Sequence, residues 1–348
     1  MVSKSTRRFQ TAGWGIIEHL WMPLNSFGER RVVQMRHTPF ADSKTNIDTL
    51  KGVLRLMRLP FLVLTPTCVM LGVGTAVWSD GPISVFYAIL TLVGAVCAHI
   101  CVNSLNEYLD FRNGLDFRTV RTPFSGGSGV LPSQPQLAHV ALTIALVALI
   151  FTGLVGLFFV AVRGLALVPV GIMGLALIVA YTRYLTRHPW LCLVAPGLGF
   201  GPVMVLGTHF VLTGQYSGTA LLASLIPFFL VNNLLLLNQF PDVEADMSVG
   251  RKNFPITIGR QASCHIFCAF IVLAYLMIPL GVGLTRLPAI SLITLAGLLV
   301  AIPTVIGVYR YAEATAELTP FAYMNLAVTI FTPLLLSLAL FLDSIPSG

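Results

Sequence analysis

Charged residues are scarce in this chain of 348 amino acids. Lys, Arg, Asp and Glu together make up 10% of it, whereas soluble domains carry roughly a quarter. Hydrophobic residues account for 56% of the sequence, and the mean hydropathy is +0.84. So little charge excludes a water-soluble enzyme of this length and predicts a membrane protein.

Cysteine is also rare, and its placement excludes two common uses. The six cysteines all lie inside apolar blocks or at their ends. Cys97/Cys101 and Cys264/Cys268 have the i, i+4 spacing of one helix face, but no acidic residue or histidine completes a tetrahedral ligand set. Free cysteine packs as a small apolar side chain. We therefore predict neither disulfides nor a cysteine-bound metal.

Long apolar blocks dominate the chain from Leu59 onward. A transmembrane helix needs about 20 mostly apolar residues, and nine blocks fit that requirement. They are Leu59–Trp78, Ile83–Val102, Leu137–Val162, Leu165–Tyr181, Pro189–Leu212, Ala220–Phe240, Cys264–Leu284, Ile290–Val308 and Phe321–Leu342. The predicted fold class is an all-α membrane protein with nine transmembrane helices. The first block begins too late to be a cleaved signal peptide.

The basic residues fix the predicted orientation. Of the 21 Lys and Arg residues, ten precede the first block, nine lie in the even-numbered connections and only Arg163 and Arg286 fall on the other side. By the positive-inside rule this places the N-terminus in the cytoplasm and the C-terminus outside. The net charge of +7 is then explained by topology and anionic lipid, so no nucleic-acid partner is predicted.

Residues 1–53 differ in composition from the rest and form a predicted cytoplasmic extension before a membrane domain over 54–348. Thr11–Leu24 contains Trp14 and Trp21 among aliphatic residues. An amphipathic helix on the membrane surface is favoured over a mobile tail.

Acidic residues are the rarest charged type, and they cluster. The chain has fourteen, and six lie in two stretches that close the second and sixth apolar blocks. Asn106 and Asp110 are four residues apart, as are Asn238, Asp242 and Asp246 in succession, so each set projects from one face of a helix or its frayed end.

Such crowding needs a counter-charge. Carboxylates at this spacing repel one another, and ionisable residues near hydrocarbon usually mark function. Asp with Asn carbonyl oxygens suits Mg²⁺, which keeps waters and binds substrate phosphate oxygens. One such cluster alone is commonly a solvated helix cap. Two clusters of the same type on the same side favour a site that holds a diphosphate through Mg²⁺.

At these residues the sequence resembles the UbiA-type intramembrane prenyltransferases, which carry two Asp-rich motifs at the cytoplasmic ends of the second and sixth of nine helices. The first motif, Asn106 to Asp116 with Gly114 inside it, is similar to the branch that prenylates 1,4-dihydroxy-2-naphthoate. The second motif, Asn238 to Asp246, is followed by Gly250-Arg251-Lys252. The resemblance runs from about Leu54 to the C-terminus.

Two positions depart from the family pattern. Many relatives have a basic residue directly before the second-motif Asp, where this chain has Pro241. Because proline breaks a helix, we expect one helical segment to end near Phe240 and Asp242 and Asp246 to lie on a new short helix. The naphthoate branch often has an acidic residue in its fifth helix, where this chain has Phe200.

The resemblance implies a polyprenyl diphosphate donor bound through two Mg²⁺ ions, and an electron-rich aromatic acceptor. The implied metal and catalytic residues are Asn106, Asp110, Asp116, Asn238, Asp242 and Asp246. The candidate diphosphate clamps are Arg121, Arg183, Arg187, Arg251 and Lys252. Candidate aromatic residues of the prenyl and acceptor pocket are Tyr108, Phe111, Tyr181 and Phe240.

Three further features have residue types that could take part in chemistry. Ser125–Gly129 lacks the Gly-Lys-Ser/Thr ending of a phosphate loop and is interpreted as a flexible lid over the site. His99 and His209 are candidate bases toward the acceptor, although a buried histidine satisfied by a neighbour is the more common situation.

Other functions stay open at this stage. A terpene cyclase would ionise the same diphosphate without an aromatic acceptor. A secondary transporter would place its acids near the bilayer centre, whereas here they lie at the ends of the spans. The predicted location is a bacterial inner membrane, in contact with lipid and with the active site facing the cytoplasm.

Overall fold

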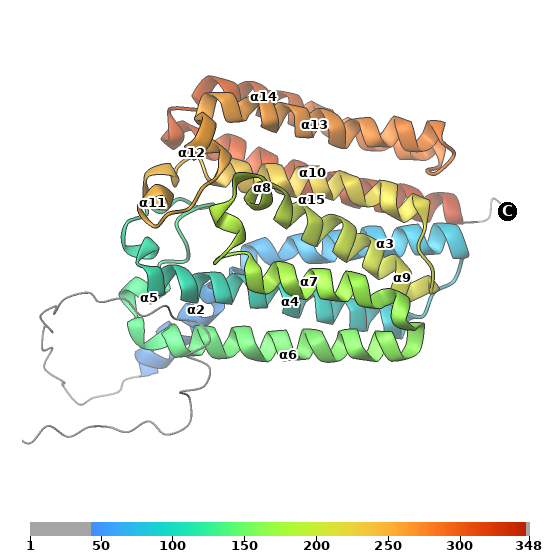
Figure 1. Ribbon diagram of the computed structural model, residues 1–348. Coiled ribbons are helices and arrows are strands. Elements are labelled where there is room, and N and C mark those ends of the chain that lie inside the picture. Colours follow the sequence, from blue (N-terminus) through green and yellow to red (C-terminus); the bar gives the residue numbers. More distant parts are fainter. Residues whose placement is uncertain (1–42, 346–348) are drawn as a thin grey trace, which may run out of the picture. The chain divides into compact units, whose positions relative to one another are not determined.

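The computed structural model describes residues 43–345, with side chains from residue 49. All regular elements of this part are helices, and the predicted surface helix at Thr11–Leu24 lies outside it. The α-helices are α2 (Ser43–Leu56), α3 (Leu64–Asp80), α4 (Val85–Asn113), α5 (Val130–Ser133), α6 (Ala138–Arg163), α7 (Val168–Ala180), α8 (Pro189–Leu198), α9 (Gly207–Thr213), α10 (Gly218–Asn238), α11 (Val243–Ser248), α12 (Phe254–Ile258), α13 (Arg260–Gly283), α14 (Leu298–Tyr311) and α15 (Thr319–Ser344) (Figure 1).

The described residues from Lys44 onward form one compact unit. The predicted domain boundary between residues 53 and 54 falls within α2 and stays a prediction.

Eight helical stretches of the described residues are long and apolar enough to cross a membrane. They correspond to eight of the nine predicted spans. The ninth predicted span, Leu165–Tyr181, corresponds to a shorter apolar helix, Leu165–Ala180. Its 16 residues extend about 24 Å along a helix axis, less than the hydrocarbon thickness of about 30 Å. The all-helical membrane fold is therefore confirmed, whereas nine spans and the orientation of the termini stay predictions.

Helix α4 is longer than its apolar block predicted. It continues past Val102 to Asn113 and ends at Gly114, whose φ of 83° is the left-handed conformation that glycine adopts without strain. Asn106 and Asp110 therefore lie on the helix itself. Spaced by four residues, they lie on nearly the same face of α4.

The second motif, Asn238 to Asp246, is divided between two helices. Helix α10 ends at Asn238, and α11 begins at Val243 with Asp242 as its N-terminal flanking residue. Pro241 lies between the two helices, as expected from its missing N–H. Asn238, Asp242 and Asp246 are therefore not on one continuous helix face, which corrects the simplest interpretation of their spacing.

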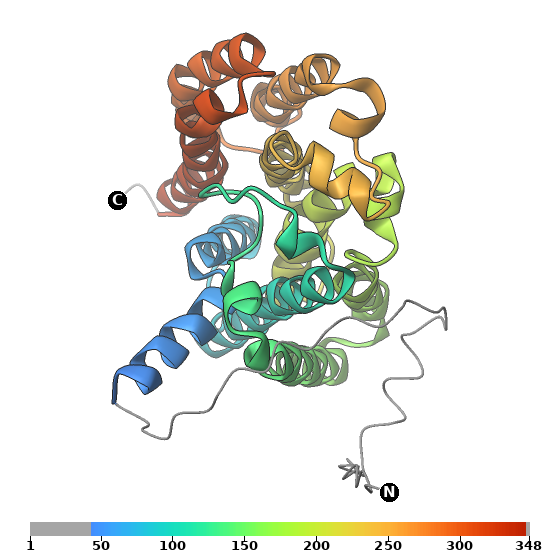
Figure 2. The ribbon, with the colours of Figure 1, turned by 90° about the vertical axis from the view of Figure 1, so that its left-hand side faces the viewer.

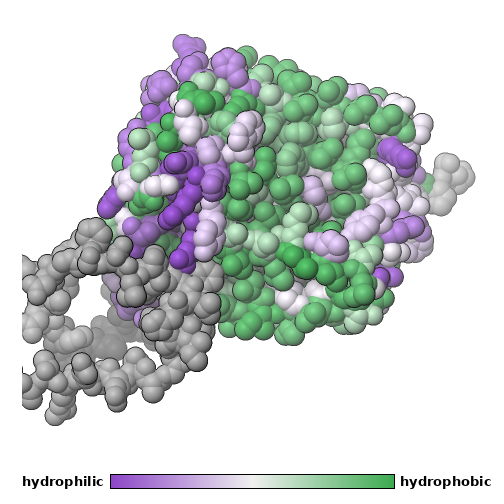
Figure 3. Space-filling view, viewed as in Figure 1, coloured by the Kyte–Doolittle hydropathy of each residue, from purple (hydrophilic) through white to green (hydrophobic). Residues whose placement is uncertain are grey.

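The helices run side by side, and short helices gather at one end. Helices α5, α11 and α12 lie at the same end of this unit (Figure 1). Seen along the helices, α4, α6 and α7 lie on one side, and α13, α14 and α15 lie on the other (Figure 2). Hydrophobic residues cover the middle of the face in Figure 3, and hydrophilic residues gather toward the end that holds α11 and α12. This arrangement matches a protein whose middle contacts lipid.

The main core lies where α3, α10, α13 and α15 meet. Its fully buried side chains include Leu71, Leu230, Phe267 and Leu336, one from each of these helices. Since lipid tails are as apolar as leucine, close van der Waals packing holds such helices together.

The span after α7 contains an irregular turn. Residues Gly199–Leu206 form a π-helical segment between α8 and α9, with Pro202 inside it. The side chain of Asn232 on α10 accepts a hydrogen bond from the backbone N–H of Gly197 at 2.6 Å. Such segments occur often at functional sites, and this one carries Phe200.

Candidate active site

A cavity of about 710 Å³ lies among α4, α6, α7 and the α8–α9 span. Its wall on α4 extends from Thr91 to Asp110, a stretch of 20 residues that rises about 29 Å along the helix axis. Apolar side chains such as Val155 and Leu175 line its long part, and polar residues line the end near Asp110. The cavity can therefore accept a long apolar chain that ends in a polar group.

All six predicted motif residues line the polar end of this cavity. They are Asn106, Asp110, Asp116, Asn238, Asp242 and Asp246. The two motifs are far apart in sequence, and the fold brings them together at one place. The structure thus joins the two acidic clusters that the sequence singled out.

Arg251 connects the two motifs directly. Its guanidinium pairs with Asp110 of the first motif and with Asp246 of the second, where Nη1 lies 3.1 Å from Oδ1. Asn253 donates to the other carboxylate oxygen of Asp246 at 3.0 Å. Although burial alone would lower it, the neighbouring carboxylates raise the pKa of Arg251 above its ordinary value, so Arg251 is a permanent cation between the motifs.

Three acceptor oxygens at this end lack a partner. Asp116 Oδ2, Asn238 Oδ1 and Asp242 Oδ1 are buried without a hydrogen bond in the described residues. Burial, together with nearby acids, raises the pKa of both Asp116 and Asp242 to about 7. Unpartnered carboxylate and amide oxygens are the donor type that a hard divalent cation takes, so these residues fit the predicted magnesium site.

The described side chains alone do not form a closed metal cage. Within residues 43–345 no group of three or more His, Cys, Asp or Glu side chains is placed to hold a metal ion. Mg²⁺ usually takes one or two carboxylates and completes its shell with water and substrate phosphate. The arrangement suits a cation that arrives together with a phosphate-bearing ligand.

The glycine-rich loop Ser125–Gly129 lies against both motifs. The N–H of Gly126 donates to Asp242 Oδ2 at 3.3 Å. Ser128 donates to Glu107 through its N–H at 2.9 Å and its hydroxyl at 2.6 Å. Gly126, Gly127 and Gly129 all have positive φ, a conformation that glycine adopts easily. These hydrogen bonds connect the loop to both motifs, and its action as a flexible lid stays a prediction.

Sequence reasoning missed Arg58 and Glu107. The Glu107 side chain is 0% exposed and pairs with Arg58, whose Nε donates to it at 2.7 Å. Arg58 Nη2 also donates to Asn106 Oδ1 at 3.3 Å. A buried glutamate requires a cation, but the burial of Glu107 and its pairing with Arg58 are set by the fold, so no signal for Arg58 was available in the sequence.

Four of the five predicted diphosphate clamps do not line the cavity. Arg251 does, and Arg58 joins it, whereas Arg121, Arg183, Arg187 and Lys252 do not. Arg121, Arg187 and Lys252 are exposed. Arg121 still lies near the first motif, because its Nη2 donates to the backbone carbonyl of Asp116 at 3.4 Å. A role of these four residues in binding the diphosphate stays a prediction.

Only one of the four predicted pocket aromatics lines the cavity, and it is Tyr181. Tyr108 and Phe111 pack outside it against a cluster that contains Leu131, and Phe240 is 0% exposed in the main core. At 100° per residue, positions 108 and 111 cannot share the helix face of Asn106 and Asp110.

The two candidate histidines differ in position. His99 lines the cavity. His209 does not; it is fully buried, with Nδ1 3.1 Å from the Thr75 hydroxyl.

The raised pKa values predict an effect of pH on stability. A carboxyl group with a pKa near 7 in the folded protein and 3.8 when unfolded stabilises the fold while protonated, and this contribution is lost as the pH rises between those values. We therefore expect Mg²⁺ to raise the Tm of the protein more at pH 8, where it neutralises ionised Asp116 and Asp242, than at pH 5. Thermal unfolding at both pH values measures this.

The double variant Asp116→Asn/Asp242→Asn provides the control. Its Tm should respond weakly to Mg²⁺ at both pH values. An equal Mg²⁺ response of the unaltered protein at pH 5 and pH 8 would contradict the prediction.

Fold and site together define an all-helical integral membrane protein with an acid-lined polar end on a long apolar cavity. The chain belongs to the UbiA prenyltransferase family, which it matches over residues 64–337.

Named relatives agree with this assignment. The chain is 28% identical to 1,4-dihydroxy-2-naphthoate octaprenyltransferase of Bacillus subtilis over 54% of its own length, and it spans only 60% of that relative. It is 21% identical to 2-carboxy-1,4-naphthoquinone phytyltransferase of Synechocystis over 76% of its own length and 82% of the relative.

Solved structures show the same fold. A UbiA homologue from Aeropyrum pernix K1 in its apo form superimposes with a TM-score of 0.61 at 19% identity, covering 82% of this chain and 98% of that one. A UbiA homologue from Archaeoglobus fulgidus bound to GPP and Mg²⁺ gives a TM-score of 0.56 at 14% identity, with 82% and 99% coverage.

Proposed function

We propose that this protein transfers a polyprenyl group from its diphosphate to an aromatic acceptor of the quinone-precursor type, such as 1,4-dihydroxy-2-naphthoate, in a Mg²⁺-dependent reaction. One observation carries the proposal: the carboxylates of two distant motifs meet at the polar end of an apolar cavity. The names of the two naphthoate-related relatives support the acceptor class, and the Archaeoglobus homologue bound a prenyl diphosphate with Mg²⁺.

The chain's own residues supply binding and charge. Asp116, Asn238 and Asp242 offer the unpartnered oxygens that would hold Mg²⁺, which when bound acts as a Lewis acid on the diphosphate. Arg251 adds a fixed positive charge at the same end. The apolar part of the cavity takes the prenyl tail and keeps water from the allylic carbon, which favours attack by an aromatic ring over hydrolysis.

The orientation proposed from the basic residues places this polar end in the cytoplasm, so that the diphosphate reaches it from the aqueous phase. A bacterial inner membrane is the proposed location. A cation site at one end of the spans, rather than at their centre, supports an enzyme over a transporter.

The test uses purified protein with labelled geranylgeranyl diphosphate and Mg²⁺, with and without 1,4-dihydroxy-2-naphthoate. We expect a product whose mass is that of the acceptor plus the prenyl group, formed only with acceptor present and lost with a chelator. A cyclic or linear hydrocarbon or alcohol formed without acceptor would identify a terpene synthase instead.

A further inference from the structure

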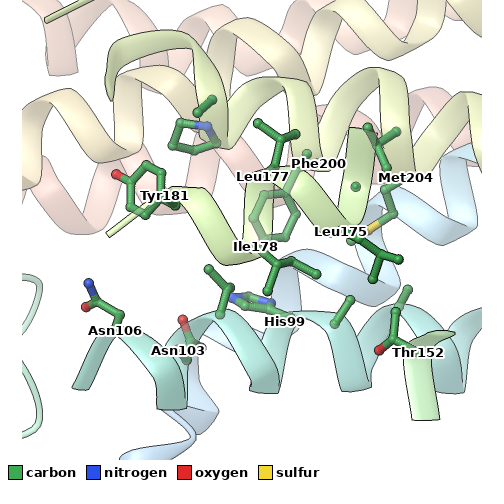
Figure 4. Close-up of a pocket in the computed structure, with 18 of the residues that line it drawn as sticks. His99, Asn103, Asn106, Thr152, Leu175, Leu177, Ile178, Tyr181, Phe200 and Met204 are labelled. Atoms are coloured by element: carbon green, nitrogen blue, oxygen red, sulfur yellow. The ribbon is translucent and has the colours of Figure 1, made fainter. Parts of the chain in front are cut away.

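The second polar feature of the cavity is His99, which lies deeper than the acids. It lies on α4 seven residues before Asn106, which is about 10 Å farther along the helix from the acidic end. Figure 4 shows Asn106, Asn103 and His99 in succession along α4. His99 is the one ionisable group that lines the cavity beyond Asn103 in the described residues. It therefore marks the place where the polar end meets the apolar part.

The imidazole is held in one orientation from two sides. Its Nδ1 lies 2.8 Å from the hydroxyl of Thr65, a buried residue of α3. Its ring packs edge-to-face against Phe200 of the π-helical segment, with ring centroids 4.9 Å apart and an interplanar angle of 79°. Figure 4 shows Phe200 directly beside the His99 ring. These two contacts orient the ring so that the edge opposite Nδ1 is left for the cavity.

The free nitrogen is Nε2. Thr65 is not a cavity residue, and in the described part of the chain Nε2 has no hydrogen-bond partner. Since Nδ1 points toward α3, Nε2 on the far side of the ring is the nitrogen left for a ligand in the cavity. In the neutral imidazole, Nε2 carries the proton if the Thr65 hydroxyl donates to Nδ1, and offers a lone pair if Nδ1–H donates to Thr65.

We propose that His99 binds the acceptor through a hydrogen bond between its Nε2 and a hydroxyl on the aromatic ring. This inference rests on the proposed transfer to an aromatic acceptor and names its recognition element. The ligand class is a phenol or hydroquinone, because a ring hydroxyl can accept from Nε2–H in one tautomer and donate to the bare nitrogen in the other. With that hydroxyl at His99 and the diphosphate at the acidic end, the ring lies between them. His99 then sets which ring carbon faces the allylic carbon of the donor.

Equilibrium binding without donor tests the proposal independently of turnover. The probes are 1,4-dihydroxy-2-naphthoate and its dimethyl ether, in which both hydroxyls are capped. We expect the unaltered protein to bind the free hydroquinone about tenfold more tightly than the ether, since losing a hydrogen bond costs about one such factor. His99→Leu should bind both equally weakly, and His99→Gln, which restores a hydrogen-bonding group, should recover part of the preference.

Steady-state kinetics provide a second readout that a merely structural role would not move. In His99→Leu we expect the KM for 1,4-dihydroxy-2-naphthoate to rise about tenfold and the KM for geranylgeranyl diphosphate to stay within twofold. His265→Leu, the same change at an exposed histidine of α13 outside the cavity, is the matched control and should leave both constants unchanged.

The two proposals fail in different ways. If His99→Leu keeps both the preference for free hydroxyls and the acceptor KM of the unaltered protein, the role of His99 is overturned while the transferase activity stands. The opposite result is also possible: the unaltered protein forms no prenylated product but binds the free hydroquinone more tightly than the ether, and His99→Leu lacks this preference. The proposed function then fails and the binding role of His99 stands.

Discussion

Asp242→Asn is expected to lower kcat/KM for the prenyl diphosphate by about a thousandfold. The substitution preserves shape, and the amide oxygen can still accept from the N–H of Gly126, which donates to Asp242 Oδ2 at 3.3 Å. The substitution removes the negative charge of a carboxylate whose Oδ1 is buried without a hydrogen-bond partner. Groups that stabilise developing charge in a water-poor site contribute on the order of a hundredfold to a thousandfold. Initial rates at saturating acceptor measure the effect.

The control is Asp343→Asn, because Asp343 bonds to Trp78 and does not line the cavity. Its kcat/KM should stay within twofold of the unaltered protein. A loss below tenfold in Asp242→Asn, with normal thermal stability, would contradict a role for this carboxylate in diphosphate activation.

Arg251→Met is expected to abolish turnover and to destabilise the fold. Arg251 is 15% exposed and lies between two carboxylates that are each 6% exposed. Removing one member of a buried ion pair costs about 3–5 kcal/mol, because it leaves the partner charge unpaired. The same change removes the fixed cation nearest the proposed diphosphate site. Thermal unfolding and initial rates, measured on the same preparation, report the two effects.

A double variant separates these two effects. Arg251→Met/Asp110→Asn removes one of the stranded charges and should regain much of the lost Tm without regaining turnover. Arg112→Met, at an exposed arginine two residues after Asp110, should change neither quantity by more than its experimental error. Recovery of turnover in the double variant would show that Arg251 acts only through the fold.

The acidic site was predictable because its residues are rare. In a membrane domain almost free of acids, two clusters with the same spacing stand out, and all six predicted residues line one cavity. The break at Pro241 was equally predictable from the chemistry of proline. Both inferences depend only on the chemistry of single residues, or on the spacing of residues that are close together in the sequence.

Contacts between distant segments were not predictable in this way. Hydropathy ended the second span at Val102, but α4 continues for 11 more residues, where cations from elsewhere in the chain, Arg58 and Arg251, pair with Glu107 and Asp110. The rotational phase of α4 placed Tyr108 and Phe111 outside the cavity. Nothing in the order of residues specifies which arginine folds back onto which carboxylate.

The cavity's course along α4, from the acids at Asp110 to the apolar wall at Thr91, has a consequence for release. A prenyl diphosphate is an amphiphile anchored by its charged head, whereas a prenylated aromatic has lost that head. Transfer would therefore remove the group that the acidic end binds most strongly. The product would then favour the lipid over the cavity. On this view the chemical step itself changes the partitioning of the molecule and drives the product into the bilayer without a separate input of energy.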